Sequence, residues 1–412
     1  MIYVAAAIYA VIFWMVTLKR PGVALAMIFA LAPFQNDLSG GGAVKFSIAE
    51  INLLLTIPVM LLRAPRLVIG PVLVPVALYL VVCIASSALR WHATTLVCLV
   101  QIALYFLVAV SMFASLPRER DDLRLAFNGL ICVGVFLGAT LAITRSQYVF
   151  GLHKNGIGAS LSCALLVALE MWFGAEPGPR RRLLTGALAV ISAGLLVSLS
   201  RGAWLGAFCG IGVLLTLRRQ FALFARAALV LIPVIVIAWQ FLPKESRETA
   251  TGFDRSRRNI DARFESIEIA REFFQQDPAL GSGVGLRKEF DATNIVWVTL
   301  AETGVLGLGA LALIHLIFLR MVWRAQKRIS REDELFSLLA LGAALVVSRL
   351  AHGLVDHYWS RGAIMIAWAS AGMATFAFWE VKRRLAAGEG EEDDEDEDEE
   401  EQPGPKKERQ LS

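Results

Sequence analysis

Three groups of polar residues interrupt a mostly apolar chain, and their residue types could bind or activate a substrate. In the first group, the spacing of Arg349, His352 and Asp356 puts them on one face of a helix, and His357 and Arg361 come soon after. Imidazoles, a carboxylate and guanidinium groups so close together favour a polar site. The alternative is that His352 and Asp356 only pair with the two arginines and cap two helix ends.

The other two groups lie earlier in the chain. Arg201 stands between two apolar runs in the stretch LLVSLSRGAWLG. An ionisable residue near the end of a membrane span is costly and is therefore a candidate functional residue, although it could instead extend its side chain to the membrane surface. His153, Lys154 and Asn155 open a further apolar run and form the third group.

These residue types indicate an anionic substrate. Arg can bind a diphosphate through two parallel hydrogen bonds while it stays charged, and fixed cations favour the departure of a diphosphate as its bond breaks. The sequence contains no Walker-type loop, dinucleotide-binding fingerprint or zinc motif. We therefore expect no metal and no cofactor.

Composition indicates the fold class. The chain has 412 residues, of which 56% are hydrophobic and 18% are charged. Many apolar runs approach or exceed the length that crosses about 30 Å of hydrocarbon, which predicts an all-α, polytopic membrane helix bundle with about 12–13 spans. The runs fall at residues 2–18, 22–34, 48–62, 67–86, 94–115, 125–143, 157–174, 184–200, 202–217, 225–242, 293–319, 333–350 and 362–379.

The charges of the connecting loops predict the orientation. Clusters of Lys and Arg, such as Arg180 to Arg182 and Lys382 to Arg384, recur in alternate loops. By the positive-inside rule those loops are cytoplasmic, so the long loop 243–292 lies outside. We expect four parts, which are an N-terminal membrane bundle (1–242), the external loop (243–292), C-terminal spans (293–384) and a disordered acidic cytoplasmic tail (385–412).

The external loop is the most polar internal stretch, with nine Lys or Arg and ten Asp or Glu between residues 243 and 292. It cannot lie in hydrocarbon, because its polar groups would have no partners there. Within it, apolar residues recur at helical spacing from Phe264 to Phe274, which predicts an amphipathic helix. The glycine-rich run 281–285 then predicts a flexible or tight loop. Because basic residues gather in short loops, the charge indicates membrane topology and no nucleic acid.

The order of several motifs resembles that of the O-antigen ligase/polymerase superfamily. The chain presents GLHKNGIGASL, then LLVSLSRGAW, then ARFESIEIAREFFQQDPALGSGVG, then TNIVWVTLAETGVLGLGAL, with a weaker echo in HGLVDHYWSRG. The resemblance implies a bundle of the lipid-linked-sugar glycosyltransferase (GT-C-like) kind that transfers a glycan from undecaprenyl diphosphate to an acceptor. It also implies that Arg201 and Arg263 contact the diphosphate. The further candidate substrate-binding residues are His153, Lys154, Asn155, Asn294 and Arg361.

One position departs from the family pattern. Ligases of this family carry a His directly before the Asn of the span that follows the loop, eleven positions ahead of a Gly. This chain has Thr293 there, before Asn294 and with Gly304 at the matching distance. The base implied for a ligase is therefore missing, which favours a polymerase over a lipid A-core ligase. The alternative catalytic residues are His357, His352, Asp356 and Asp291.

The leading hypothesis is a glycosyltransferase of the bacterial inner membrane that acts at the periplasmic face in surface polysaccharide biosynthesis. Its partners would be an undecaprenyl-diphosphate-linked glycan, an acceptor glycan or glycolipid, the lipid bilayer and other polysaccharide-assembly proteins. The rival hypotheses are a transporter of a small solute such as bicarbonate, from the same superfamily, and a non-catalytic scaffold. The sequence has no clear internal repeat, which counts against transport.

Single-cysteine labelling tests the orientation. We expect a cysteine at Ser266 to react with a membrane-impermeant reagent added from outside, and a cysteine beyond Gly388 to react only from inside, because the basic loops alternate in that frame. Labelling of position 266 from the cytoplasm alone would show that the orientation is reversed, and the candidate site would then lie at the cytoplasmic face.

Overall fold

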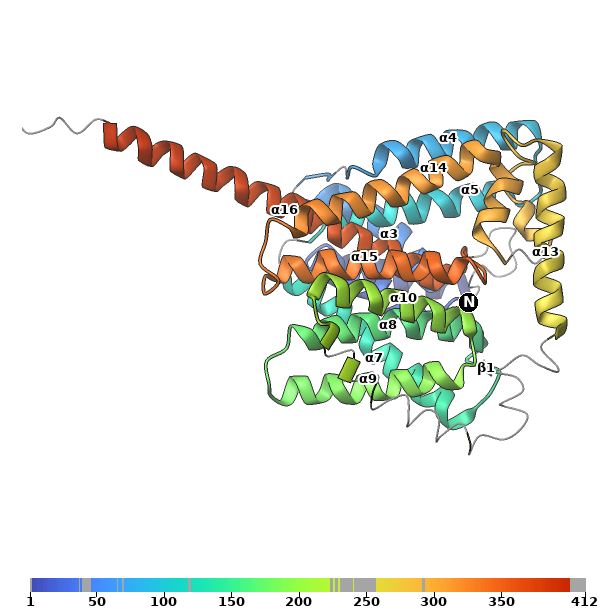
Figure 1. Cartoon of the computed structure of the whole chain (residues 1–412), viewed down its shortest axis with the longest axis horizontal. Coiled ribbons are helices and arrows are strands. Elements are labelled where there is room, and N and C mark those ends of the chain that lie inside the picture. The colour runs from blue at the N-terminus through green and yellow to red at the C-terminus, as the bar shows by residue number, and fades with distance from the viewer. Residues whose placement is uncertain are drawn as a thin grey trace, which may run out of the picture.

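The structure of the protein is a computed structural model. It describes residues 2–36, 46–64, 66–68, 70–117, 120–222, 257–290 and 293–400, together with the single positions 38, 225, 226, 229 and 240. Over these residues the chain is almost entirely helical, and its only strands form one short hairpin. Most helices lie side by side in a bundle, while one helix crosses an end of that bundle (Figure 1). The predicted all-α membrane class is confirmed.

The described elements follow one another in three stretches. The first stretch contains α1 (Ile2–Thr17), α2 (Pro21–Leu31), α3 (Ile48–Arg63), α4 (Leu73–Leu89), then α5 (Thr95–Ala103), the π-helix η1 (Leu104–Ala109) and α6 (Val110–Ser115) as one continuous rod, and α7 (Arg120–Thr144). The second contains the strands β1 (Tyr148–Val149) and β2 (Leu152–His153), followed by α8 (Lys154–Phe173), α9 (Pro179–Val197) and α10 (Arg201–Arg218). The third contains α13 (Arg257–Gln276), the 3-10 helix η2 (Leu286–Lys288), α14 (Ile295–Gln326), α15 (Glu334–Gly353) and α16 (Arg361–Glu400).

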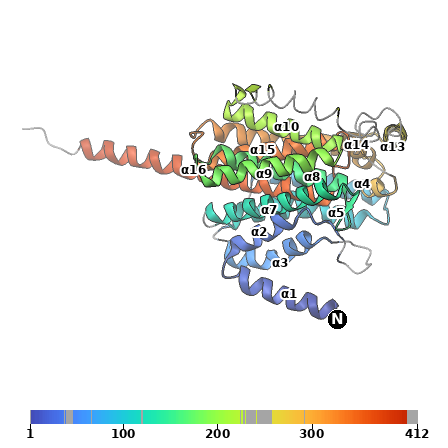
Figure 2. The same ribbon diagram turned by 90° about the horizontal axis from the view of Figure 1, so that it is seen from below.

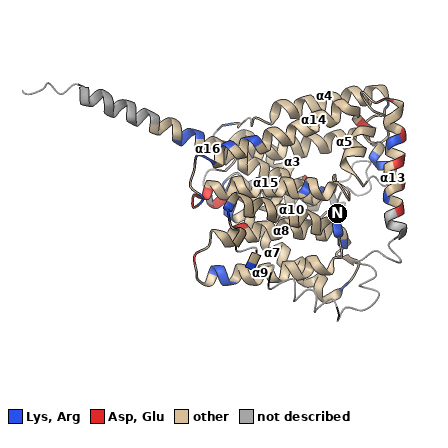
Figure 3. Ribbon diagram, in the orientation of Figure 1, with Lys and Arg blue, Asp and Glu red and all other residues tan. Residues whose placement is uncertain are grey.

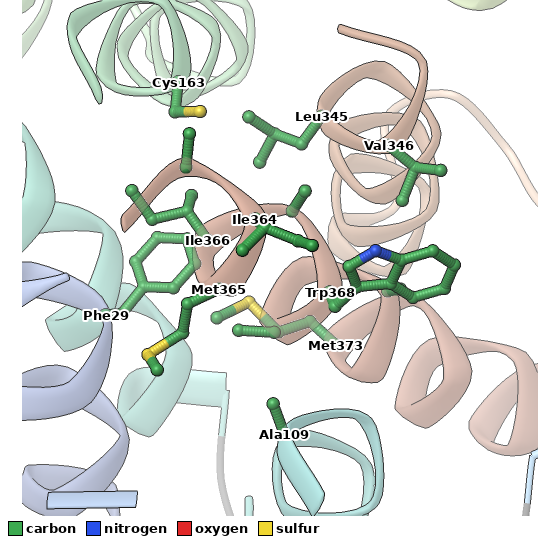
Figure 4. Packing of buried hydrophobic residues seen from close by; sticks show 14 of the residues in the cluster. Phe29, Ala109, Cys163, Leu345, Val346, Ile364, Met365, Ile366, Trp368 and Met373 are labelled. Atoms are coloured by element: carbon green, nitrogen blue, oxygen red, sulfur yellow. The ribbon is translucent and has the colours of Figure 1, made fainter. Parts of the chain in front are cut away.

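The core lies around the last two bundle helices. Residues of α16 such as Ile364 and Trp368 are fully buried, and they pack beneath Leu345 and Val346 of α15 (Figure 4). Helix α1 lies at the outer edge of the bundle (Figure 2), where many of its apolar side chains are exposed. Apolar side chains exposed along a bundle edge are expected where lipid replaces water as the solvent.

Six described helical segments are long and apolar enough to cross a membrane, and three shorter apolar helices accompany them. The six are Thr95–Ser115, Asp121–Thr144, Lys154–Phe173, Ile295–Gln326, Glu334–Gly353 and Arg361–Gly388. Helices α9 and α10 carry arginines at their ends, which lowers their hydropathy, but they run beside the long helices (Figure 1). The predicted span over 225–242 lies mostly outside the described residues.

Helix α16 extends beyond its apolar part. It is helical to Glu400, whereas the sequence predicted disorder in the acidic tail, and Figure 1 shows it projecting away from the bundle. Like charges three and four residues apart repel one another on a helix surface, and the acidic run 391–401 contains no apolar residue that could be buried. Disorder of the tail in solution stays a prediction.

The glycine-rich loop before α14 is tight and fits against the turn between α4 and α5. The backbone N–H of Val284 donates to Ser87 Oγ at 3.2 Å, and Thr95 Oγ1 donates to the Val284 carbonyl at 2.6 Å. Gly283 has a φ of 95°, and a Cβ there would lie 2.1 Å from the carbonyl oxygen of Arg90. Only glycine accommodates both the left-handed backbone and this close approach.

A buried carboxylate fixes the other side of the same loop. Glu302 of α14 accepts hydrogen bonds from the backbone N–H groups of Gly285 and Arg287, at 3.0 and 2.9 Å. It also accepts from Arg287 Nη1 at 3.1 Å, and both side chains are almost fully buried. Helix α14 kinks at Gly304, whose φ is 62°, so the loop can approach the helix next to Glu302.

Helix α13 follows the predicted amphipathic pattern, with one change of face. Ser266 and Ala270 are buried, and Phe273 packs with Ala270 against the start of α14. The labelling test therefore requires the cysteine at the exposed Glu268 of the same helix in place of the buried Ser266. Phe264, which was predicted to share the packed face, is instead 64% exposed. The helix therefore contacts the bundle through its small residues, which leaves Phe264 available to another apolar surface.

Removing the Glu302 charge should destabilise the protein. In Glu302→Gln, the buried Arg287 would lose its counter-charge, and removal of one partner from a buried ion pair costs about 3–5 kcal/mol. Thermal unfolding of the purified protein in detergent would measure the loss. The matched control is Glu289→Gln on the same loop, whose side chain is 52% exposed and which should change stability by less than about 1 kcal/mol. Equal unfolding temperatures for both variants would contradict a structural role for the buried pair.

Candidate active site

A cavity of about 770 Å³ lies where α13 crosses the end of the bundle. Charged residues gather on α13 and at the two ends of the bundle, with few between them (Figure 3). Eight of the candidate residues from the sequence line this cavity, namely His153, Lys154, Asn155, Arg201, Arg263, His352, Asp356 and His357. The three polar groups, separated by up to two hundred residues in the chain, therefore meet in one place.

The β-hairpin brings the first of these groups to the cavity. Phe150 and Gly151 at its tip have positive φ angles of 52° and 75°, as a two-residue turn of type I′ requires. The paired strands place His153 at the start of α8, where its Nδ1 accepts the backbone N–H of Asn155 at 3.3 Å. His153 thus caps a helix whose N-terminus faces the cavity.

A second helix also begins at the cavity. Arg201 is the first residue of α10, and the hydroxyl of Ser200 before it accepts the N–H of Ala203 at 3.4 Å. The positive end of a helix dipole attracts anions. Two helix N-termini, Arg201 and Arg263 together make this cavity electropositive.

A buried chain of polar side chains forms the opposite wall. Arg349 is 2% exposed, and its Nη1 donates to His352 Nδ1 at 3.1 Å. The ring proton of neutral His352 therefore lies on Nε2, which faces Asp356 Oδ2 at 3.8 Å. Asp356 Oδ2 in turn lies 3.4 Å from Arg263 Nη2, so the chain connects α15 with α13. Arg349 and His352 lie on α15, whereas Asp356 lies in the turn after Gly353, where the helix ends, so the prediction that all three share one helix is correct for the first two only.

His357 differs from His352 in its surroundings. Its backbone N–H donates to Asp356 Oδ1 at 2.8 Å, and its carbonyl accepts from Arg349 Nη2. These contacts fix the backbone of His357, while the residue as a whole is exposed and lines the cavity. His352 is buried, with both ring nitrogens facing Arg349 and Asp356. Of the two imidazoles, that of His357 is the better placed to meet a substrate.

The protonation of two residues follows from their surroundings. Burial alone would raise the pKa of Asp356, but its interaction with the ring of His352 and the hydrogen bond from the N–H of His357 hold that pKa well below its usual range. Burial, together with the charge of Lys154, lowers the pKa of His153. At neutral pH the cavity therefore contains an ionised Asp356 and a neutral His153.

A second, apolar cavity of about 360 Å³ adjoins the first. Arg201, Arg263 and Thr293 line both cavities. The remaining walls of the second cavity are mostly apolar, and they consist of Leu205, Phe264, Ile267, Asn294, Leu354 and Val355. The exposed Phe264 of α13 thus faces this cavity, and the two arginines lie at the boundary between a polar and an apolar space.

The other three candidate residues do not line the polar cavity or lie outside the residues that the structure describes. Asn294 caps α14 and its Nδ2 donates to the Leu354 carbonyl at 2.8 Å, so its amide is already engaged. Arg361 Nη1 lies 3.9 Å from Glu50 Oε2, and Arg361 does not line the cavity, although Ser360 before it does. Asp291 lies outside the described residues. The substrate contacts of Asn294 and Arg361, and the catalytic role of Asp291, stay predictions.

Uncharged polar residues complete the cavity, and the sequence did not single them out. Gln35, Asn36, Gln147 and Ser360 all line it, and Gln35 Nε2 is buried without a hydrogen-bond partner within the described part of the chain. Amides and hydroxyls carry no charge, so a search for ionisable residues passes over them. Such groups are suited to the hydroxyls of a sugar.

The fold and the site define a polytopic helical membrane protein with an electropositive, polar cavity at one end of the helix bundle. Residues 186–310 match the family model described as O-antigen ligase. The match confirms the resemblance to the O-antigen ligase superfamily, and it supports a membrane glycosyltransferase of that family, with a lipid-linked glycan as substrate, in general terms. A search of curated proteins finds no match to the chain. The matched segment includes Arg201, Arg263 and Thr293, while the 352–357 cluster lies beyond it.

The two histidines of this cluster should respond differently to substitution. We expect His352→Ala to lower stability by about 1–3 kcal/mol, because it leaves the buried Arg349 Nη1 without its acceptor and removes one neighbour of the Asp356 carboxylate. The matched change His357→Ala affects an exposed side chain and should stay within about 0.5 kcal/mol of wild type. Thermal unfolding in detergent compares them, and a larger loss in His357→Ala would refute this distinction.

Proposed function

We propose that the protein is an inner-membrane glycosyltransferase that transfers or polymerises glycan units from undecaprenyl diphosphate onto an acceptor glycan. The reaction would take place in the polar cavity, at the periplasmic face, during surface polysaccharide biosynthesis. The family match supports glycan transfer in general, and the arrangement of the two cavities supports the particular donor.

The observation that carries this proposal is the position of Arg201 and Arg263. Both arginines line the polar cavity and the apolar cavity at once. A polyprenyl diphosphate glycan has the same order of parts, with an apolar chain on one side of the diphosphate and a sugar on the other. The diphosphate would lie at the arginines, the first polyprenyl units against Phe264 and Leu205, and the glycan in the polar cavity.

The arginines would also contribute to the chemical step. Bond cleavage at the anomeric carbon concentrates negative charge on the leaving diphosphate, and positioned guanidinium groups stabilise that charge as it develops. The N-termini of α8 and α10 add partial positive charge at the same cavity. No step in this scheme requires a metal.

His357 is the proposed base that accepts the proton of the attacking hydroxyl. Its side chain lies in the cavity, whereas Asp356 is held as a carboxylate of low pKa by His352 and the N–H of His357. A base works best with a pKa near the operating pH, which disfavours Asp356. Thr293 has no basic nitrogen, and its hydroxyl lies 3.3 Å from Ser266 Oγ. We propose that the protein is a polymerase of repeat units and not a lipid A-core ligase, because the proposed base lies on a different element from the ligase His.

Release of undecaprenyl diphosphate by purified protein in liposomes tests the function. We expect Arg201→Lys and Arg263→Lys each to reduce the rate by about 10–100-fold, since a point charge replaces a bidentate hydrogen-bonding group. His357→Ala should reduce it by about 10²–10⁴-fold. Ladder or single-addition products would separate a polymerase from a ligase.

The control is Arg271→Lys, which alters an arginine on α13 that pairs with Glu268 at the surface. It should retain wild-type turnover. Near-normal turnover in both Arg201→Lys and Arg263→Lys, at normal protein level, would exclude a diphosphate held by these arginines.

A further inference from the structure

A third cavity of about 290 Å³ adjoins the candidate active site. His357 and Ser360 line both this cavity and the large polar one, so the two spaces meet at the proposed base. The other lining residues are Arg287, Lys288, Ile295, Val298, Tyr358 and Trp359. Arg201 and Arg263 are not among them, so this space is separate from the proposed diphosphate position.

Two side chains that line this cavity, those of Arg287 and Trp359, have buried hydrogen-bond donors without acceptors within the described part of the chain. The side chain of Arg287 is 3% exposed, and its Nη1 donates to Glu302. Within the described part of the chain, Arg287 Nε and Nη2 have no hydrogen-bond partner, and neither has the indole Nε1 of Trp359. The guanidinium lies 4.2 Å from the centroid of the Trp359 ring. Because buried donors are nearly always paired in folded proteins, three unpaired donors at one cavity point to a ligand that supplies acceptors.

The charges of the cavity indicate the sign of that ligand. Glu302 neutralises Arg287, and Lys288 adds a further positive charge. The nearby Glu289 is engaged with His92 across the loop. Partial burial and the charge of Arg287 lower the pKa of Lys288, so the cations repel one another here. An added anion would relieve that repulsion and accept hydrogen bonds from Arg287, Trp359 and Lys288.

We propose that this cavity binds an oxyanion group, a phosphate or a carboxylate, carried by the acceptor glycan. The inference rests on the proposed function, because it takes the large cavity as the site of transfer. An anion bound beside Arg287 would place the rest of the acceptor next to His357, which lines both spaces. The acceptor would thus be selected by its charge, apart from any contact with the donor.

A pair of acceptors tests this specificity. The same oligosaccharide is supplied with and without a phosphate or carboxylate substituent, and KM and kcat are measured for each. We expect Lys288→Gln and Trp359→Phe to raise KM for the anionic acceptor by roughly tenfold, with kcat and the KM of the donor unchanged. KM for the neutral acceptor should not change. Trp359→Phe keeps an aromatic ring over Arg287, so the fold is preserved while the N–H is lost.

The matched control is Arg271→Gln, which also removes one cation from the external loop but at its surface. It should leave both acceptors unaffected. An equal rise in KM for the two acceptors in Lys288→Gln, or a rise in the KM of the donor, would overturn the proposal.

A binding measurement separates failure of this inference from failure of the proposed function. Inorganic phosphate, compared with chloride at equal ionic strength, should raise the unfolding temperature of the wild type through preferential binding to the folded state. The rise should be smaller in Lys288→Gln than in Arg271→Gln, with the residual shift assigned to Arg201 and Arg263. If Lys288→Gln retains the full shift, the cavity holds water only and the inference is wrong, whatever the transfer assay shows.

Discussion

A carboxylate buried near the N-terminal end of α14 holds the glycine-rich loop and α13 in place. Glu302 accepts two backbone N–H groups of the glycine-rich loop and the guanidinium of Arg287. An ionised carboxylate is stable in a buried position only when its acceptor sites are filled in this way. The loop is therefore fixed between α14 and the α4–α5 turn. It fixes α13 as well, because α13 leads directly into it.

The position of α13 determines the geometry of the site. Arg263 stands on this helix, and only its placement across the bundle end brings it within 3.4 Å of Asp356 and onto the same cavities as Arg201. Arg349 supports the facing wall, since its guanidinium holds the Tyr358 carbonyl and the ring of His352. The cavity is thus electropositive, because the negative charge of Asp356 at its wall is balanced by Arg263 on one side and by the ring N–H of His352 on the other. Such fixed charges need little reorganisation when an anionic leaving group forms.

The fold class and the three groups of candidate polar residues could be predicted from the sequence for one reason. A charged residue near a membrane span is costly, so each one in an apolar stretch is easily identified as a candidate functional residue. The charges of the loops predict the orientation of the spans. Arg201, Arg263 and the 352–357 cluster were found on these grounds and through the family resemblance. The side chains of Gln35, Asn36 and Gln147 are uncharged, so this search missed them. The pairing of Arg287 with Glu302 was missed for another reason. It depends on the kink at Gly304 and on the positive φ angles of the loop glycines, which the spacing of apolar residues does not predict.

The replacement of a ligase His by Thr293 is easier to understand from this geometry. Thr293 lies between Ser266 of α13 and the boundary of the two cavities, on the side where the proposed lipid donor enters. The turn that carries Asp356, His357 and Ser360 forms the other side, and it borders the cavity of Arg287 and Lys288. In the proposed function, α10 and α13 would therefore hold the donor, together with Leu354 and Val355, and residues 357–360 would border the acceptor. The proposed base would then lie on the segment that contacts the acceptor. Substitutions in this short segment could therefore change the acceptor that is used without disturbing the arginines that hold the diphosphate.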